Sequence, residues 1–206
     1  MKNNTSPFSD YVNVHGLDDI IALHDLALQE LKAIELESQS VHLPALNQLG
    51  YSLTHFLNAI SNSKSEEEVK NELEKAKNHI KRCLYDAVEY QILDYLESII
   101  KFKNDFRNIN IAEFIPDYHL TMKKVEKIKN DLKFYTFSSD KRDLHFEQIK
   151  KSQTILKEIT NQLESTRPVL IDAVQGNRSK AFSITRNLLL LVLSLLGVII
   201  AFLAKV

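Results

Sequence analysis

The sequence is poor in the residues that interrupt helices and in those that carry covalent chemistry. Its 206 residues include four glycines, four prolines, one cysteine and no tryptophan. Because glycine and proline most strongly end helices, their scarcity predicts long uninterrupted helices and excludes a Gly-rich phosphate-binding loop. The lone cysteine, Cys83, excludes an internal disulfide and suits a reducing compartment.

An excess of charge is also missing. The 26 basic and 27 acidic residues leave a formal net charge of -1, so no nucleic-acid partner is expected. The first seven residues have no apolar core, and position 2 is Lys2 in place of the glycine that myristoylation requires. Neither a signal peptide nor an N-terminal lipid is therefore expected.

Motifs of catalysis and cofactor binding are absent from the sequence. None of the seven histidines forms a His-x-x-x-His pair, and no Gly-x-Ser-x-Gly motif occurs. Cys83 lies between apolar helical positions, where a small core residue is the expected role. We therefore expect no catalytic residue, no metal and no cofactor, and a protein that is not an enzyme.

The stretch 76–87 resembles helices of HEPN-like domains, which are helical modules common in microbial conflict systems. Members of that family that cleave RNA carry an arginine, then four to six residues, then a histidine. Here Arg142 and His145 have only two residues between them, and no other pair has the required spacing. The resemblance therefore implies a non-catalytic helical scaffold.

Apolar residues recur every three or four positions along most of the chain, which predicts an all-α fold. We expect a flexible N-terminal arm over residues 1–16, then a cytoplasmic bundle of about five helices over 17–175. The longest helix is expected from Glu66 to about Phe106, behind a capping box at Ser65 and Glu68; whether it is continuous stays open. In the helix expected from Pro44 to about Asn62, the apolar side is formed by Leu46, Leu49, Leu53, Phe56, Leu57 and Ile60.

The last cytoplasmic helix is expected from about residue 140. Ile149, Leu156, Leu163 and Leu170 recur every seven residues, and a bundle helix is favoured over a coiled coil because this repeat is short. Pro168 is expected to kink or end the helix. Residues 176–181, beginning with Gly176, are expected to form a basic joint before the C-terminal segment.

Residues 182–206 are predicted to form a single transmembrane helix. The stretch Leu188–Ala204 carries no charge over 17 residues, about 26 Å of helix. Basic residues lie mainly before it, at Arg178, Lys180 and Arg186, so the N-terminal domain is expected to face the cytoplasm. The predicted layout is a tail-anchored, single-pass protein, with a bacterial inner membrane favoured over a eukaryotic organelle and the lipid bilayer as a partner.

Small and polar residues of the predicted span fall on one stripe, which predicts homo-oligomerisation through close helix contacts or around a pore. The stripe consists of Asn187, Ser194, Gly197, Ala201 and Ala204. The leading hypothesis is an oligomeric membrane effector or ion-channel subunit regulated by its cytoplasmic domain, a layout shared with effectors of anti-phage defence. The alternative is a membrane-tethered helical adaptor that recruits a cytoplasmic protein partner.

Overall fold

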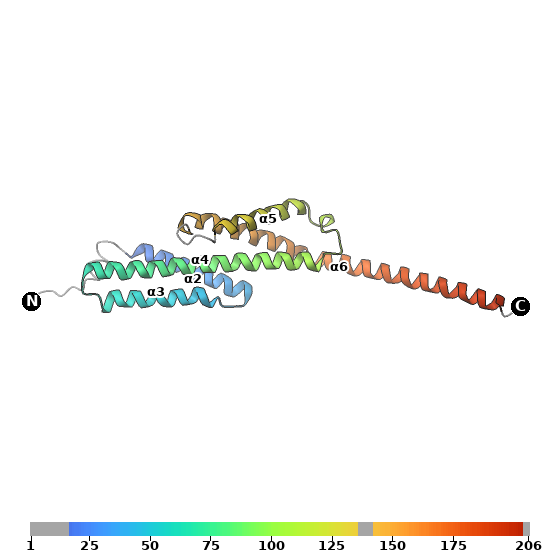
Figure 1. Cartoon of the computed structure of the whole chain (residues 1–206), viewed down its shortest axis with the longest axis horizontal. Coiled ribbons are helices and arrows are strands. Elements are labelled where there is room, and N and C mark those ends of the chain that lie inside the picture. The colour runs from blue at the N-terminus through green and yellow to red at the C-terminus, as the bar shows by residue number, and fades with distance from the viewer. Residues whose placement is uncertain (1–16, 136–141, 204–206) are drawn as a thin grey trace, which may run out of the picture. The chain divides into compact units, whose positions relative to one another are not determined.

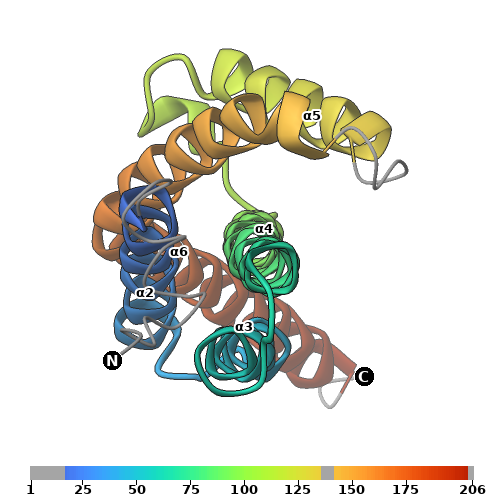
Figure 2. The same cartoon turned by 90° about the vertical axis from the view of Figure 1, so that its left-hand side faces the viewer.

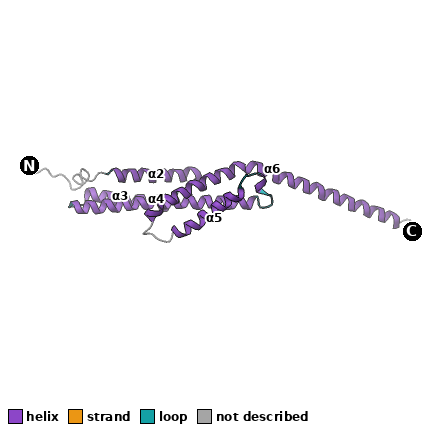
Figure 3. Ribbon diagram, turned by 90° about the horizontal axis from the view of Figure 1, so that it is seen from above, coloured by secondary structure: helices purple, strands orange, loops and turns teal. Residues whose placement is uncertain are grey.

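The structure, a computed structural model, is helical in every element that it describes (Figure 3). It describes the backbone of residues 17–135 and 142–203, and side chains within 17–132, 145–176 and 182–192. The predicted all-α fold is confirmed for these residues. The elements are α2 (Asp18–Ser38), α3 (Leu43–Ser61), α4 (Glu66–Asp105), the short 3-10 helix η1 (Ile111–Glu113), α5 (Tyr118–Tyr135) and α6 (Arg142–Leu203).

Helix α4 answers the question of continuity, because its 40 residues form one unbroken helix of about 60 Å. The predicted cap is present at its start, where the Glu68 backbone N–H donates to Ser65 Oγ at 3.2 Å. The Glu68 carboxylate accepts from the Lys64 backbone N–H at 2.6 Å, one residue earlier than the capping-box pattern places this bond. Apolar residues spaced three or four apart along α4 form a row that is buried throughout: Val69, Leu73, Ala76, Ile80, Leu84, Val88, Ile92, Tyr95, Ile99, Phe102 and, just beyond the helix, Phe106.

The chain divides into two compact units, and α4, α5 and α6 each contribute to both. Unit 1 contains residues 1–97 and 127–157, and unit 2 contains residues 98–126 and 158–206. In unit 1, α2 and α3 run beside the first part of α4 (Figures 1 and 2). This three-helix group contains the site described below.

A polar network, buried around Glu30, joins α2 to α4 and α6 inside unit 1. Glu30, only 8% exposed, accepts from Lys150 Nζ and, at 3.1 Å, from Gln153 Nε2, which also donates to Gln91 Oε1. One turn of α4 further along, Glu37 accepts from Tyr95 Oη at 2.5 Å and from Lys157 Nζ at 2.5 Å. The bonds to Glu30 fix the position of α2, because this buried carboxylate would be costly without its donors.

A second network stabilises unit 2 around Arg167. Its guanidinium lies 5.4 Å from the ring centroids of both Phe102 and Phe106. The same group donates to Asp105 at 2.7 Å and to Glu164 at 2.6 and 2.8 Å. These hydrogen bonds hold the pKa of the Glu164 carboxyl below its usual value. Cation–π and ionic contacts therefore anchor α6 to the end of α4.

Helix α6 corrects the predicted C-terminal architecture. It is one helix of 62 residues that contains Pro168 and continues past Gly176, so the expected end at the proline does not occur. Within the described residues, no helix combines the length and the low polarity that crossing a membrane requires. This finding contradicts the predicted transmembrane helix and the single-pass membrane localisation.

The described apolar side chains of this part of α6 are those of Leu188 to Val192, and exposed Arg186 and Asn187 precede them. A membrane-spanning helix needs about 20 predominantly apolar residues. The side chains of residues 193–203, and all of Ala204, lie outside what the structure describes.

Candidate protein-binding groove

Helix α3 stands apart from the rest of the chain because it carries no lysine, arginine, aspartate or glutamate. Charged residues make up 26% of the protein, yet the only titratable side chains of the 19 residues Leu43–Ser61 are those of Tyr51 and His55. A helix at a protein surface normally has a charged outer face. The outer face of α3 must therefore be uncharged.

The two sides of α3 are the reverse of what its leucine pattern predicts. Its buried residues are small: Ala45, Ser52 and Ala59, seven residues apart, are at most 5% exposed. The large apolar residues point outward, with 44–56% of each exposed: Leu46, Leu53, Leu57 and Ile60. The apolar side of an amphipathic helix is the side expected to be buried, and here that expectation is wrong for these four residues.

Small inner residues explain how α3 is held. Ala59 packs directly against Val69 and Leu73 of α4, with Phe56 beside this cluster. Alanine and serine let two helices approach closely without steric conflict, so α3 needs only its small residues and the half-buried Leu49 and Phe56 for packing. Its leucines remain available for another contact.

Two of the outward leucines, Leu46 and Leu53, belong to one wall of an apolar groove with a volume of about 870 Å³. Ile20, Ile21 and His24 of α2 line the opposite wall. Ala76 and Ile80 of α4 form the floor between them. The α3 wall extends from Leu46 to Phe56, and this length of helix measures about 15 Å.

Gly50 lies in the middle of the α3 wall, between Leu46 and Leu53. A methyl group built at Gly50 would meet no atom within 4 Å, so the space in front of this residue is open. The serine and threonine hydroxyls of this wall donate to carbonyls of α3 itself. Ser52 Oγ donates to the Leu49 carbonyl and Thr54 Oγ1 to the Gly50 carbonyl, each at 3.1 Å. The groove therefore offers an apolar surface with a low point at its centre.

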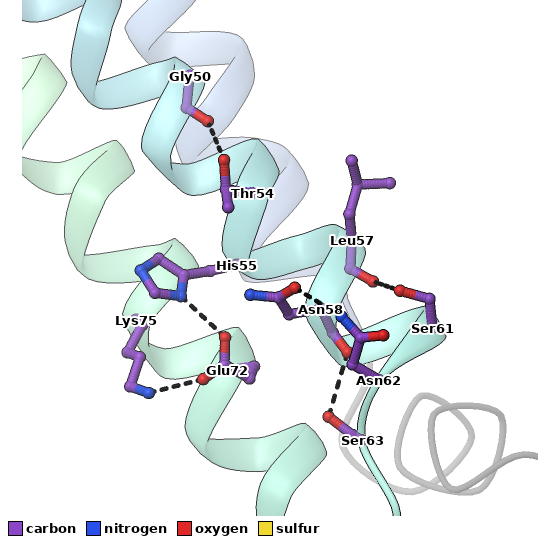
Figure 4. A network of polar contacts seen from close by, with 10 residues as sticks. All are labelled: Gly50, Thr54, His55, Leu57, Asn58, Ser61, Asn62, Ser63, Glu72 and Lys75. Carbon is purple, nitrogen blue, oxygen red and sulfur yellow. Dashed lines mark hydrogen bonds and ion pairs between the residues drawn. The ribbon is translucent and has the colours of Figure 1, made fainter.

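Polar contacts between α3 and α4 fix the rotation of α3 (Figure 4). His55 Nδ1 lies 2.8 Å from Glu72 Oε2, and Lys75 Nζ donates to Glu72 Oε1 at 2.6 Å. Lys75 and then His55, as hydrogen-bond partners, lower the pKa of the Glu72 carboxyl to about 2. Rotating α3 to bury its leucines would break the His55–Glu72 contact.

Two stacked imidazoles continue this network along α3. The rings of His55 and His79 lie 5.2 Å apart, and His79 Nδ1 is 2.8 Å from Gln48 Oε1. Burial, and then the neighbouring His55 and Arg82, lower the pKa of His79. His79 is therefore neutral at pH 7 and takes part in the contact without adding charge beside the groove.

Charged residues of α2 lie beside the groove residue Ile21. Asp18, Ile21 and Asp25 follow a spacing of three and four residues and so share one side of α2, and both aspartates are exposed. His24 Nδ1 lies 3.7 Å from Asp25. The groove thus has an acidic rim on the α2 side and an uncharged rim on the α3 side.

The geometry around the groove offers nothing for metal or covalent chemistry among the described residues. No three histidine, cysteine, aspartate or glutamate side chains in that part of the chain come together as metal ligands. Burial raises the pKa of the Cys83 thiol to about 12, and this residue is fully buried. A neutral, inaccessible thiol is not a nucleophile at neutral pH.

The residues predicted as the site lie elsewhere, at the C-terminal end of α6. Arg186 and Asn187 are exposed helical residues of α6. The other predicted residues, Arg178, Lys180, Ser194, Gly197 and Ala201, have helical backbone but side chains outside the described set, and Ala204 lies outside it entirely. The predicted stripe and basic joint therefore stay predictions.

Sequence reasoning missed the groove, although one signal was present. An uncharged 19-residue helix in a chain with 26% charged residues indicates either deep burial or an apolar outer surface. Comparisons with protein-family models, with curated proteins and with solved structures find no match for this chain.

Proposed function

We propose that this chain is a helical adaptor that binds an amphipathic helix of a partner protein in the groove formed by α2, α3 and α4. The observation that carries the proposal is the apolar wall of α3, whose leucines face outward while its small residues face inward. The membrane-pore hypothesis is not carried forward, because it requires a membrane-spanning helix.

The dimensions of the groove suit a helix. Three helices already surround it on three sides, and a fourth placed along the open side completes a four-helix arrangement. Its wall of about 15 Å accommodates two to three turns, and the open space at Gly50 admits a large side chain. Helix-in-groove recognition uses anchors at spacings of three, four and seven residues.

Acidic residues of α2 favour a partner helix that has basic residues on one flank. Asp18 and Asp25 share the side of α2 that carries the groove residue Ile21, and α2 has six acidic residues and one lysine. A bound helix with lysine or arginine along that edge gains electrostatic attraction, whereas an acidic helix is repelled. The proposed partner segment is therefore a basic amphipathic helix.

Energetics support binding of moderate strength. Fully burying a leucine or isoleucine side chain contributes about 1.5–3 kcal/mol. Ile21, Leu46 and Leu53 line the groove and each expose about half of their surface, so covering one of them contributes roughly 1 kcal/mol. Apolar contact alone therefore contributes about 3 kcal/mol, and complementary charge and a well-packed anchor must supply the rest.

The test is selection from a displayed library of helical peptides on the purified full chain. We expect enriched peptides to carry apolar residues at helical spacing with basic residues on one flank. Their binding is expected to weaken at least about tenfold with Leu53→Asp, because a charge enters the apolar wall. Leu36→Asp is the matched control, since Leu36 is a leucine of α2 that is 82% exposed and does not line the groove.

Two results would count against the proposal. One is enrichment of peptides without helical apolar spacing. The other is equal binding by the Leu53→Asp and Leu36→Asp variants while both keep their helical circular dichroism.

A further inference from the structure

The C-terminal part of α6 presents a second apolar surface, distinct from the groove. Five consecutive residues, Leu188 to Val192, are each 46–65% exposed. Phe182 and Ile184, one to two turns earlier, are 71% and 68% exposed. Within its own unit, this part of α6 extends away from the end of α4, η1 and the start of α5 (Figure 1).

The pattern of α6 changes along its length. Between Ile149 and Leu170 its apolar residues form one stripe with a seven-residue repeat, and this stripe is buried, as a bundle helix requires. From Leu188 the apolar residues are consecutive. At about 100° per residue, five of them span about 400°, which is more than a full circle around the helix axis. This segment is therefore apolar on every side.

From this geometry we propose that the C-terminal part of α6 assembles with the same segment of other copies of this chain, as a helical bundle of three or more copies. A helix that is apolar on all sides is stable when it is surrounded, and one neighbouring helix covers only one side. The matching surface is supplied by the chain itself, because residues 187–204 carry no charged side chain that would repel another copy.

The proposal goes beyond the adaptor function and does not depend on it. Its consequence for an adaptor is multivalency, since each copy added to the bundle brings another α2–α3 groove. Linked grooves bind a partner that has several copies of the recognised helix more tightly than one groove does.

The experiment measures the mass of the purified full chain by sedimentation velocity. We expect a species of three or more chains of 23.7 kDa each. Leu188→Asp and Leu190→Asp place a charge on nearly opposite sides of the helix, about 200° apart. Each variant alone is expected to raise the dissociation constant at least about tenfold, since every side is covered in the bundle. Leu93→Asp, at a residue of α4 that is 65% exposed, is the matched control and is expected to change nothing.

Several results would overturn the proposal. A monomeric wild-type chain would show that the chain does not associate with itself. A dimer weakened by only one of the two substitutions would show that only one side of the helix is in contact. Cosedimentation of the chain with phosphatidylcholine vesicles, in place of an oligomer of its own, would make lipid the partner of this segment. Circular dichroism of both variants verifies that α6 remains helical, and the groove test above gives its result independently of each of these outcomes.

Discussion

The apolar pattern of α3 and its structure assign different sides of the helix to the core, and a stability measurement distinguishes the two. Leu53 belongs to the apolar side of α3 that the pattern assigns to the core, yet it is 56% exposed. A buried leucine replaced by alanine costs about 2–5 kcal/mol, because apolar contact is lost and a cavity remains. An exposed one leaves no cavity and loses only part of the transfer free energy. We therefore expect Leu53→Ala to cost less than about 1 kcal/mol.

The matched comparison is Leu73→Ala in the same unit. Leu73 is 1% exposed and packs against Ala59, so its truncation is expected to cost about 2–5 kcal/mol. A third variant, Ala59→Leu, inserts a large side chain between α3 and α4 where there is no room. Overpacking of this kind typically costs about 1–3 kcal/mol. The three variants together test which side of α3 faces the core.

The assay is urea unfolding of the full chain, followed by far-UV circular dichroism. With a slope of about 2 kcal/mol/M, a change of 1 kcal/mol moves the midpoint by roughly 0.5 M. The reasoning would be refuted by a Leu53→Ala variant as unstable as Leu73→Ala, with Ala59→Leu near neutral. That result would place the leucines of α3 in the core and remove the groove.

Three further predictions concern charged groups. The pKa of Glu72 in the folded chain is about 2, below its usual 4.5. The stability that Glu72 contributes is therefore present above pH 4.5 and is lost as the pH falls toward 2. In an acid titration of the free energy of unfolding, a Glu72→Gln variant is expected to lose less stability than the wild type. Arg167→Met removes the ionic contacts with Asp105 and Glu164 and two cation–π contacts. We expect it to lower the free energy of unfolding by about 1–2 kcal/mol. A urea midpoint equal to that of the wild type would show that these partly exposed contacts contribute nothing. Asp25→Asn is expected to slow association of a basic groove-binding peptide and to reduce its salt dependence, as measured by stopped-flow fluorescence; an unchanged salt slope would exclude the acidic rim from recognition.

The groove and the C-terminal part of α6 differ in how far the sequence alone predicts them. The apolar segment after Asn187 is evident from composition alone, although the structure contradicts its predicted role as a membrane span. The groove depends on which side of α3 is buried. Periodicity groups Leu46, Leu53 and Leu57 on one side but does not say what that side meets, since burial requires a neighbour.

The sequence by itself determined the all-α fold and the buried row of α4, because these follow from local helix propensity and from apolar residues spaced three to four apart; that α4 is continuous came from the structure. It also determined the cap at Ser65, which is formed by residues close together along the chain. The continuity of α6 through Pro168 and Gly176 was decided by tertiary structure, since contacts such as those of Arg167 with α4 outweigh the local preference to stop.

Tertiary structure likewise decided the orientation of α3. The buried residues Ala45, Ser52 and Ala59 are small, Ala59 packs against α4, and the His55–Glu72 contact fixes the rotation. Each of these effects joins residues of different helices, so neither is contained in the local pattern of α3. Close packing favours the side that fits, which here is the side with the smaller and less apolar residues, and the leucines are left facing outward as the wall of the groove.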